Sequence, residues 1–332
     1  MEQLIHADRN RAEVGVVNDF TRFDAQIHHN CRLEDNTFAL EMTVGAWQAD
    51  KIMRGDYVYI DQSEFGGIVA SVEKNTATDT VTIKGPLWRA LFAMRIISPP
   101  EGEAYKVYTN AEPNAVIADV VGNDYVRLFH VPEIDTGVTM SCQFRYPTKL
   151  AGLSKALNAI GFTLSCIYDA SAQHVVLRAR RCVDYSDYSD ISPDLGIGMT
   201  VSAGRVDDYN HVIGLGQGEL TERMVREMWM IDGRLYRTRP ASLTETDLRS
   251  MTFDYPNAES EDELYSSMGD ALLKYAAMSS AAIDLSELQI DLQLDDLITT
   301  IDRDLNITAK KSVSQRILTI TDEGSTIQTE VE

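Results

Sequence analysis

The chain has 332 residues, a mass of 37.0 kDa, and 51 acidic against 30 basic side chains, which give a net charge of −21. This length predicts two or three domains around a real hydrophobic core. So acidic a chain is poorly suited to binding nucleic-acid backbones or anionic membranes, because both need clusters of Lys and Arg. No apolar run approaches the ~20 residues of a membrane span, and the first residues lack the apolar core of a signal peptide, which predicts a protein made and kept in a cytoplasm.

The first third of the chain, residues 1–104, predicts a β domain. Apolar and polar side chains alternate over 37–44, as they do in a strand with one buried face. Four short strands are expected, at 37–44, 56–61, 66–75 and 80–85. Strands this short and closely spaced favour an antiparallel meander or a small barrel. Residues 87–97 then carry apolar side chains at helical spacing and predict a helix.

Residues 105–200 predict a small α+β domain. Asn110 and Gly122 bracket one expected helix, and Thr148 and Gly161 bracket a second, with the polar residue as N-cap and the glycine as the stop. Two strands around a five-residue polar loop follow and indicate a hairpin, at 162–168 and 174–181. The polar, turn-rich stretch after this hairpin marks an expected domain boundary.

Residues 201–332 predict a second β domain that one helix interrupts. Ser260 and Glu263 form a capping-box pattern, and an apolar stripe at helical spacing follows them. The stripe consists of Leu264, Met268, Ala271, Leu272, Tyr275 and Met278. Two closing strands are expected at 288–294 and 316–324.

No motif predicts a catalytic, cofactor-binding or metal-binding residue. The stretch GLGQGEL at 214–220 has Glu219 where a dinucleotide-binding fingerprint needs glycine, and it does not open a βαβ unit. Its glycines are better explained by a β-bulge or by close approach of two segments. Close carboxylate pairs, such as those in DYSDYSD at 184–190, arise by chance among 51 acidic residues.

The cysteines and histidines likewise show no metal-ligand spacing. The four cysteines are far apart along the chain, and zinc sites need closely paired ligands. Free, buried thiols are therefore expected at Cys31, Cys142, Cys166 and Cys182. His28 and His29 would point to opposite faces if residues 25–33 form a strand, so they would not bind one ion together.

Charge is segregated along the last third. Basic residues concentrate at Arg223, Arg226, Arg234, Arg237 and Arg239, where nearby carboxylates favour a salt-bridged rim between subunits. Residues 259–304 hold twelve acidic and two basic side chains, a net charge of −10. A segment of this density forms a solvated face or lines a pore, and both alternatives are open.

The order of several short motifs resembles that of tail-hub proteins from long-tailed bacteriophages. Each motif is short, and it is their collinear order over most of the chain that carries the resemblance. The motifs are DYVYID at 56–61, GGIVASV at 66–72, TVTIKGPLWRALFAMRII at 80–97, DDYN at 207–210, VIGLGQGE at 212–219 with Arg223 after it, LQLDDLITTIDRDLNIT at 292–308, and QRILTITDEG at 315–324.

This resemblance implies two tail-tube-like β-barrels with a small α+β insertion. It implies a homotrimeric structural protein of the virion, the baseplate hub at the tail tip, which joins the six-fold tail tube to the three-fold tip and forms part of the conduit for genome ejection. The implied partners are the tail tube or distal tail protein, the tape-measure protein, and tip or fibre proteins. DNA would pass only in transit, without membrane binding or a cofactor. Since the chain ends at Glu332, wall-degrading or receptor-binding modules are expected in another polypeptide.

Two other functions stay open on the sequence alone. Two of the many carboxylates could serve a cell-wall hydrolase, and Trp47, Trp88 and Trp229 could be the sugar platforms of a carbohydrate-binding adhesin. The apolar surroundings of all three tryptophans favour core packing instead. If the chain does form a ring, its charge predicts an acidic inner wall that repels DNA.

Overall fold

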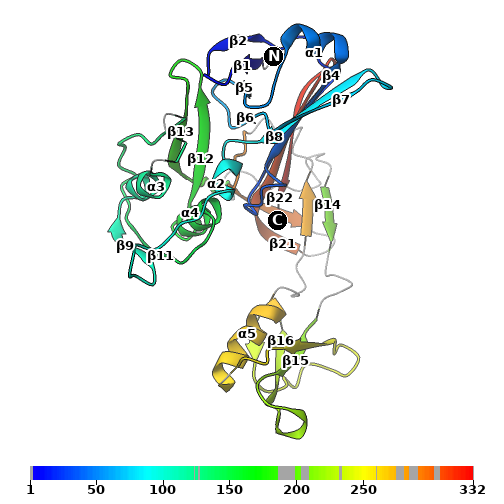
Figure 1. Ribbon diagram of the computed structural model, residues 1–332. Helices are drawn as coiled ribbons and strands as arrows, with labels where there is room; N and C mark the ends of the chain where they lie inside the picture. Colours follow the sequence, from blue (N-terminus) through cyan, green and yellow to red (C-terminus); the bar gives the residue numbers. More distant parts are fainter. Residues whose placement is uncertain are drawn as a thin grey trace. The chain divides into compact units, whose positions relative to one another are not determined.

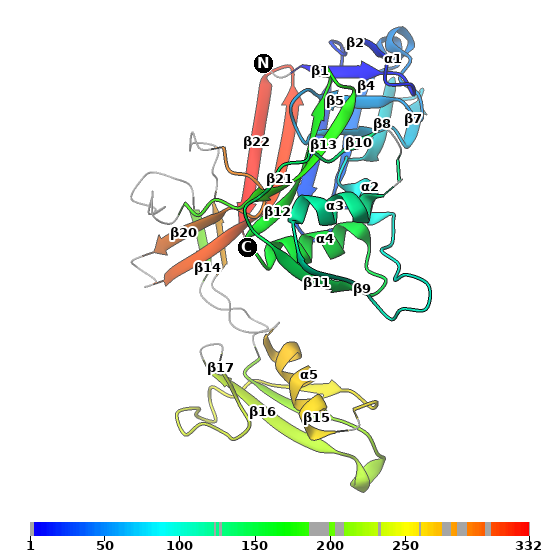
Figure 2. The ribbon, with the colours of Figure 1, turned by 90° about the vertical axis from the view of Figure 1, so that its left-hand side faces the viewer.

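The computed structural model of the chain describes residues 3–122, 124–125, 128–185, 199–202, 209–231, 234–258, 260–273, 280–283, 291–302 and 307–331. Unit 1 comprises Met1–Gly198, Ile283–Thr300 and Lys310–Glu332, and unit 2 comprises Met199–Ala282 and Ile301–Ala309. Strands dominate (Figures 1 and 2), so the predicted α+β, mainly β class is confirmed. None of the described helices is long and apolar enough to cross a membrane.

The largest sheet of unit 1 combines strands from both ends of the sequence. Its order is β20-β21-β3-β4-β8-β7, and β22 pairs with β21 as well. The strands are β3 (Arg22–His28), β4 (Thr37–Thr43), β7 (Ser71–Asn75), β8 (Thr80–Pro86), β20 (Leu297–Asp302), β21 (Ile307–Thr321) and β22 (Gly324–Val331). The antiparallel pairing of β21 with β3 places Leu318 opposite Ala25, and both side chains are buried. The closing hairpin therefore completes a sheet that the third strand begins.

A smaller sheet lies beside it, in the order β2-β1-β5-β6. Its strands are β1 (Leu4–Ala7), β2 (Glu13–Val16), β5 (Tyr57–Ile60) and β6 (Gly66–Ile68). The single strand predicted at 66–75 is wrong, because the chain changes pairing partner within it. The Val69 amide donates to the Asp56 carbonyl, and the next amide, that of Ala70, donates to Lys84. Residues before this point pair with β5 and residues after it pair with β8.

Two short helices connect these strands. In α1 (Val44–Asp50) the Thr43 hydroxyl accepts a hydrogen bond from the Ala46 amide at 3.1 Å, an N-cap. The helix predicted at 87–97 is reduced to α2 (Ala90–Ala93). The chain leaves the helix early because the Ile97 amide donates to the Pro147 carbonyl rather than to the preceding turn.

The middle of unit 1 contains the predicted helices and hairpin. Its elements are β9 (Lys106–Ala111), α3 (Pro113–Val121), β10 (Phe129–His130), β11 (Met140–Phe144), α4 (Lys149–Asn158), β12 (Phe162–Asp169) and β13 (His174–Arg181). Thr148 caps α4 as predicted, and Gly122 follows the end of α3. Asn110 is not the cap of α3, because it lies in β9; the Glu112 carboxylate accepts from the Ala115 amide instead.

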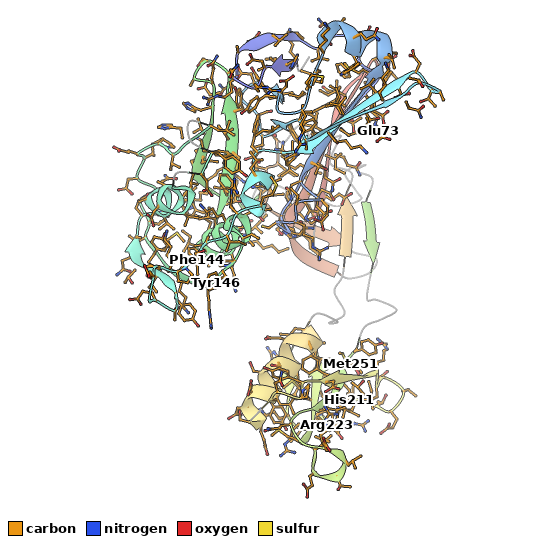
Figure 3. All side chains as sticks on the ribbon, in the orientation of Figure 1. Glu73, Phe144, Tyr146, His211, Arg223 and Met251 are labelled. Atoms are coloured by element: carbon orange, nitrogen blue, oxygen red, sulfur yellow. The ribbon has the colours of Figure 1, made fainter. Side chains whose placement is uncertain are left out.

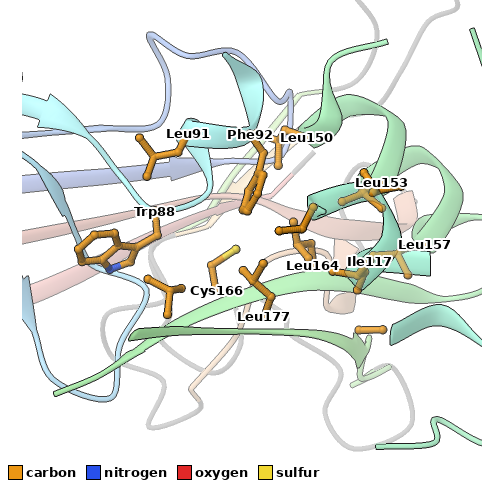
Figure 4. Packing of buried hydrophobic residues seen from close by; sticks show 14 of the residues in the cluster. Trp88, Leu91, Phe92, Ile117, Leu150, Leu153, Leu157, Leu164, Cys166 and Leu177 are labelled. Carbon is orange, nitrogen blue, oxygen red and sulfur yellow. The ribbon is translucent and has the colours of Figure 1, made fainter. Parts of the chain in front are cut away.

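One continuous hydrophobic cluster fills this region (Figure 4). Helices α3 and α4 pack on the β12–β13 hairpin and contribute Ile117, Leu153 and Leu157. The cluster continues into the segment around α2, where Trp88 and Phe92 are fully buried. The core thus joins residues on both sides of position 104. The division into domains at 1–104, 105–200 and 201–332 stays a prediction.

Unit 2 is a four-stranded sheet covered on one face by a helix. The sheet order is β17-β16-β15-β18. The elements of this part of unit 2 are β15 (His211–Leu215), the 3₁₀ turn η2 (Leu220–Glu222), β16 (Val225–Ile231), β17 (Arg234–Tyr236), β18 (Ser250–Asp254) and α5 (Glu261–Leu273). A separate two-stranded pair joins β14 (Met199–Ser202) to β19 (Ser280–Ile283). The capping residue of α5 is Ser260, as predicted, since its hydroxyl accepts from the Glu263 amide at 3.2 Å. Tyr275 and Met278 of the predicted stripe lie outside the described residues.

Two expectations for the fold need correction. The described strands form open sheets rather than closed barrels, because the edge strands β7 and β22 are not paired with one another. The strand predicted at 288–294 is absent over 291–294, and its first three residues lie outside the described part. The strand predicted at 316–324 is confirmed over residues 316–321, which belong to β21, and ends there because residues 322–323 form the turn to β22.

Candidate functional site

A groove of about 410 Å³ lies in unit 1 against the outward face of the β12–β13 hairpin. Alternation along β12 and β13 puts Thr163, Ser165, Arg178 and Arg180 on this face, with Arg178 opposite Ser165. The remaining walls come from the loop at 62–65, the segment 291–294, and the closing strands. Segments that are distant in sequence therefore meet here.

Arg316 on β21 is the most enclosed charged side chain of the groove. Its side chain is 7% exposed, and its guanidinium donates to the Gln293 amide oxygen at 2.7 Å and to the Asp291 carboxylate at 3.0 Å. Asp291 itself is 78% exposed, so water competes for this contact. The Phe65 ring lies 5.5 Å from the guanidinium carbon, and the buried Arg316 Nε has no hydrogen-bond partner among the described residues. Burial lowers the pKa of Arg316, and Asp291 opposes that shift.

Arg180 joins the hairpin to the C-terminal part of unit 1. Its guanidinium donates to the Asp296 carboxylate and to the Leu294 carbonyl, both at 2.8 Å. Asp296 is fully buried and also accepts from the amides of Val183 and Gln293. A buried carboxylate with this many donors is well compensated, so the contact positions the groove wall.

The charged side chains that line the groove differ in whether they have a hydrogen-bond or ion-pair partner. Five of them line it, and the two carboxylates are both engaged, Glu64 with the Cys166 amide at 2.7 Å and Asp291 with Arg316. The Arg178 side chain, which is exposed, forms no hydrogen bond or ion pair with the described residues. The lining has three arginines against two carboxylates and therefore a formal net charge of +1, and its one charged side chain without a partner among the described residues is a cation.

Arg89 is buried and forms a hydrogen bond with the backbone of β12. Its guanidinium donates to the Leu164 carbonyl at 2.7 Å. Burial alone would lower the pKa of Arg89, but the attraction of Glu64 and other nearby groups outweighs it and raises the pKa. No local pattern in the sequence signals this network, because Glu64 and Cys166 are 102 residues apart.

The predicted arginine concentration lies in unit 2, and its partners belong to the same unit. Arg223 pairs with Asp254, Arg226 with Glu261, Arg237 with Asp262, and Arg239 with Glu245. These pairs use carboxylates of this chain, so they do not need the neighbouring subunit that the sequence analysis expected. They also show that part of the acidic segment 259–304 is occupied by ion pairs within the chain.

The glycines of GLGQGEL permit close approach of the backbone to other segments, as the sequence predicts. A Cβ atom on Gly214 would collide with the Met268 side chain of α5, which packs directly on β15. Gly218 has a φ of +109° and lies against the Glu222 carbonyl. Arg223, which is labelled in Figure 3, completes the turn, since its Nε donates to the Gly216 carbonyl at 3.1 Å. The motif is a packing element of unit 2.

We expect Gly214→Ala to lower the free energy of unfolding of unit 2 by about 1–3 kcal/mol, the usual effect of overpacking a core. Combining it with Met268→Ala should give less loss than the sum of the two single changes, because the truncated methionine no longer meets the new methyl group. Urea unfolding followed by Trp229 fluorescence measures both effects. Simple additivity of the two changes would contradict the assigned contact.

The histidines and cysteines agree only in part with expectation. His29 lies outside β3, which ends at His28, and the two rings are 5.1 Å apart, so the opposite-face argument does not apply. No three His, Cys, Asp or Glu side chains of the described part form a group that could hold a metal ion. All four cysteines are free; Cys166 is buried and the others are half-buried. Burial raises the pKa of all four thiols, that of Cys182 to about 11.

A serine–histidine–glutamate arrangement in unit 2 escaped the sequence analysis. The Ser250 Oγ lies 2.7 Å from the His211 Nδ1, and the His211 Nε2 lies 3.5 Å from the Glu227 carboxylate. The His211 ring also stacks on Trp229 at 5.0 Å, and its Nε2 is buried. Each of the three residues comes from a different strand, so the contacts join β15, β16 and β18.

The chain was compared with known protein families, sequences and solved structures. No protein-family model and no curated protein sequence matches the chain. Its structure is similar to that of the 43 kDa tail protein of prophage MuSo2 from Shewanella oneidensis, with a TM-score of 0.56 and 12% identity over 100% of this chain and 98% of that one. The chain has the fold of phage tail proteins.

Two further solved structures share this tail-protein fold. One is the tail protein from Neisseria meningitidis MC58, with a TM-score of 0.53 and 12% identity over 99% of this chain and 95% of that one. The other is the prophage tail protein gp18 from Listeria monocytogenes EGD-e, with a TM-score of 0.52 and 12% identity over 99% and 94%. The likeness includes both units.

The tail-protein fold leaves surfaces on unit 1 that suit protein contacts. Among the described strands, β22 pairs only with β21 and β7 only with β8, so each presents an unpaired edge. Near the β9–β11 pair, Val107 is 61% and Tyr146 63% exposed, and Tyr146 points outward beside Phe144 (Figure 3). Of the tryptophans, Trp88 is fully buried, Trp229 is 9% exposed and Trp47 is half-buried, so none offers a full ring face for stacking on a sugar.

Proposed function

We propose that the chain is a structural, non-enzymatic component of a bacteriophage tail, and specifically the homotrimeric hub at the tail tip. In this role three copies join the six-fold tail tube to a three-fold tip and form part of the conduit through which the genome is ejected. The observation that carries the proposal is the likeness to three tail proteins over at least 99% of this chain and at least 94% of theirs.

Features of the surface support assembly into a larger particle. Unpaired strand edges invite pairing with another chain, and closed rings remove them. The exposed apolar side chains at Val107 and Tyr146 are of the kind that protein interfaces cover. The proposed neighbours are the tail tube or distal tail protein, the tape-measure protein, and tip or fibre proteins. The proposed location is the virion, after assembly in the host cytoplasm.

The mass of the assembled particle tests this role. Native mass spectrometry of the chain, alone and with its tail-tube partner, should find three copies or multiples of three. A discrete trimer whose mass does not change on dilution would indicate specific assembly, whereas a range of masses that falls on dilution would indicate aggregation. A chain that stays monomeric in both samples would refute the trimeric hub, and turnover of peptidoglycan that one Asp or Glu substitution abolishes would refute the non-enzymatic role.

A further inference from the structure

The groove beside β12–β13 has the chemistry of a peptide-binding site. Its volume of about 410 Å³ falls within the range of natural ligand sites, about 300–1,000 Å³. Its rim and floor include Ile167 and Ile327, which are half-buried, and the buried ring of Phe65. The lining also includes Ser165, the three guanidinium groups, and Thr163, whose hydroxyl donates to Asp295 at 2.5 Å. A ligand for this groove must therefore be both apolar and polar.

The charges of the groove define the polar part of that ligand. Both lining carboxylates already accept hydrogen bonds, whereas Arg178 has no partner among the described residues. Arg316 is more than nine-tenths buried, yet its carboxylate partner Asp291 is 78% exposed and is a weak competitor. An incoming carboxylate could bind Arg178 and replace Asp291 at Arg316, with charge-assisted hydrogen bonds to both.

We propose that this groove binds a short peptide segment in which a carboxylate is flanked by apolar side chains. A nucleic acid fits less well, because a chain with a net charge of −21 repels a polyanion and a single unpartnered arginine releases few counterions. The apolar side chains of the groove would also gain no hydrophobic contact from a phosphate backbone. The inference rests on the groove itself and does not depend on the proposed role at the tail tip.

Fluorescence anisotropy with the full chain tests the proposal. The probe is a fluorescein-labelled pentapeptide of alternating leucine and glutamate, and the matched probe has glutamine in place of glutamate. We expect the glutamate peptide to bind more tightly, and its binding to weaken when salt is raised. Arg178→Gln should weaken it about tenfold, the effect of losing one charge-assisted hydrogen bond. Arg178→Lys should restore part of the loss.

Arg181→Gln is the matched control, since Arg181 is also exposed on β13 but is not among the residues that line the groove. It removes the same charge and should leave binding unchanged. The proposal is overturned if neither peptide binds, if the two peptides bind equally, or if Arg181→Gln has the effect of Arg178→Gln. Tighter binding of single-stranded oligodeoxythymidylate than of the glutamate peptide would instead assign the groove to nucleic acid.

Discussion

Trp88→Ala should lower the free energy of unfolding of unit 1 by about 3–5 kcal/mol, the loss that accompanies truncation of a buried aromatic side chain. Trp88 is fully buried, stacks on Tyr168 at 5.1 Å and on Tyr57 at 6.0 Å, and belongs to the cluster that joins α2 to the β12–β13 hairpin (Figure 4). Few neighbours can collapse into a space bounded by two sheets. Guanidinium-induced unfolding measures the change.

Trp47→Ala is the matched control for that experiment. Trp47 is half-buried in the middle of α1, and its indole donates to the carbonyl of Ile52, just beyond the helix, at 2.9 Å. Its removal should cost clearly less than that of Trp88, because less apolar surface returns to water. Equal losses for the two variants would contradict the position of Trp88 at the centre of the unit 1 core.

Asp296→Ala should destabilise unit 1 by about 3–5 kcal/mol, because it leaves the Arg180 guanidinium and two partly buried amides without their acceptor. The carboxylate is fully buried and receives hydrogen bonds from Arg180, Val183 and Gln293. We expect a lower midpoint of denaturant unfolding with little change in slope.

The neighbouring change Asp291→Ala provides the comparison. Asp291 also pairs with an arginine, Arg316, but it is 78% exposed, and Arg316 keeps its hydrogen bond to Gln293, so the loss of Asp291 should cost clearly less than that of Asp296. If Asp291→Ala proved as harmful as Asp296→Ala, the buried position of Asp296 would not be the source of its effect.

Local elements of this fold could be predicted from sequence because their signals are local. Thr148 and Ser260 predict the starts of α4 and α5, because each side chain accepts a hydrogen bond from an amide in the first turn of its helix. The alternation in 162–168 and 174–181 likewise specified the β12–β13 hairpin. Partner choice could not be predicted, since alternation identifies a strand without saying what it pairs with. Neither Val69 nor Ala70 is a typical turn residue, although the chain passes from one sheet to another between them.

The candidate site was inaccessible to sequence reasoning for the same reason. Side chains alternate between the two faces of a strand, so the sequence of β13 predicts that Arg178 and Arg180 share one face. Their surroundings depend on Arg316, which lies in the part of β21 that pairs with β3, and on Asp291 in the segment before β20. The arginines of unit 2 were the conspicuous ones, yet they pair with nearby carboxylates of their own unit.

The pairing of β21 with β3 also has a consequence for synthesis on the ribosome. Thr319 donates to Asp24 across this pair, although the two residues are 295 positions apart. At about 5–20 residues per second, β3 waits roughly 15–60 s for its partner strand to be made. During that interval one edge of β3 is open to other nascent chains. Slower translation of the segment between them should therefore increase misassembly rather than improve folding.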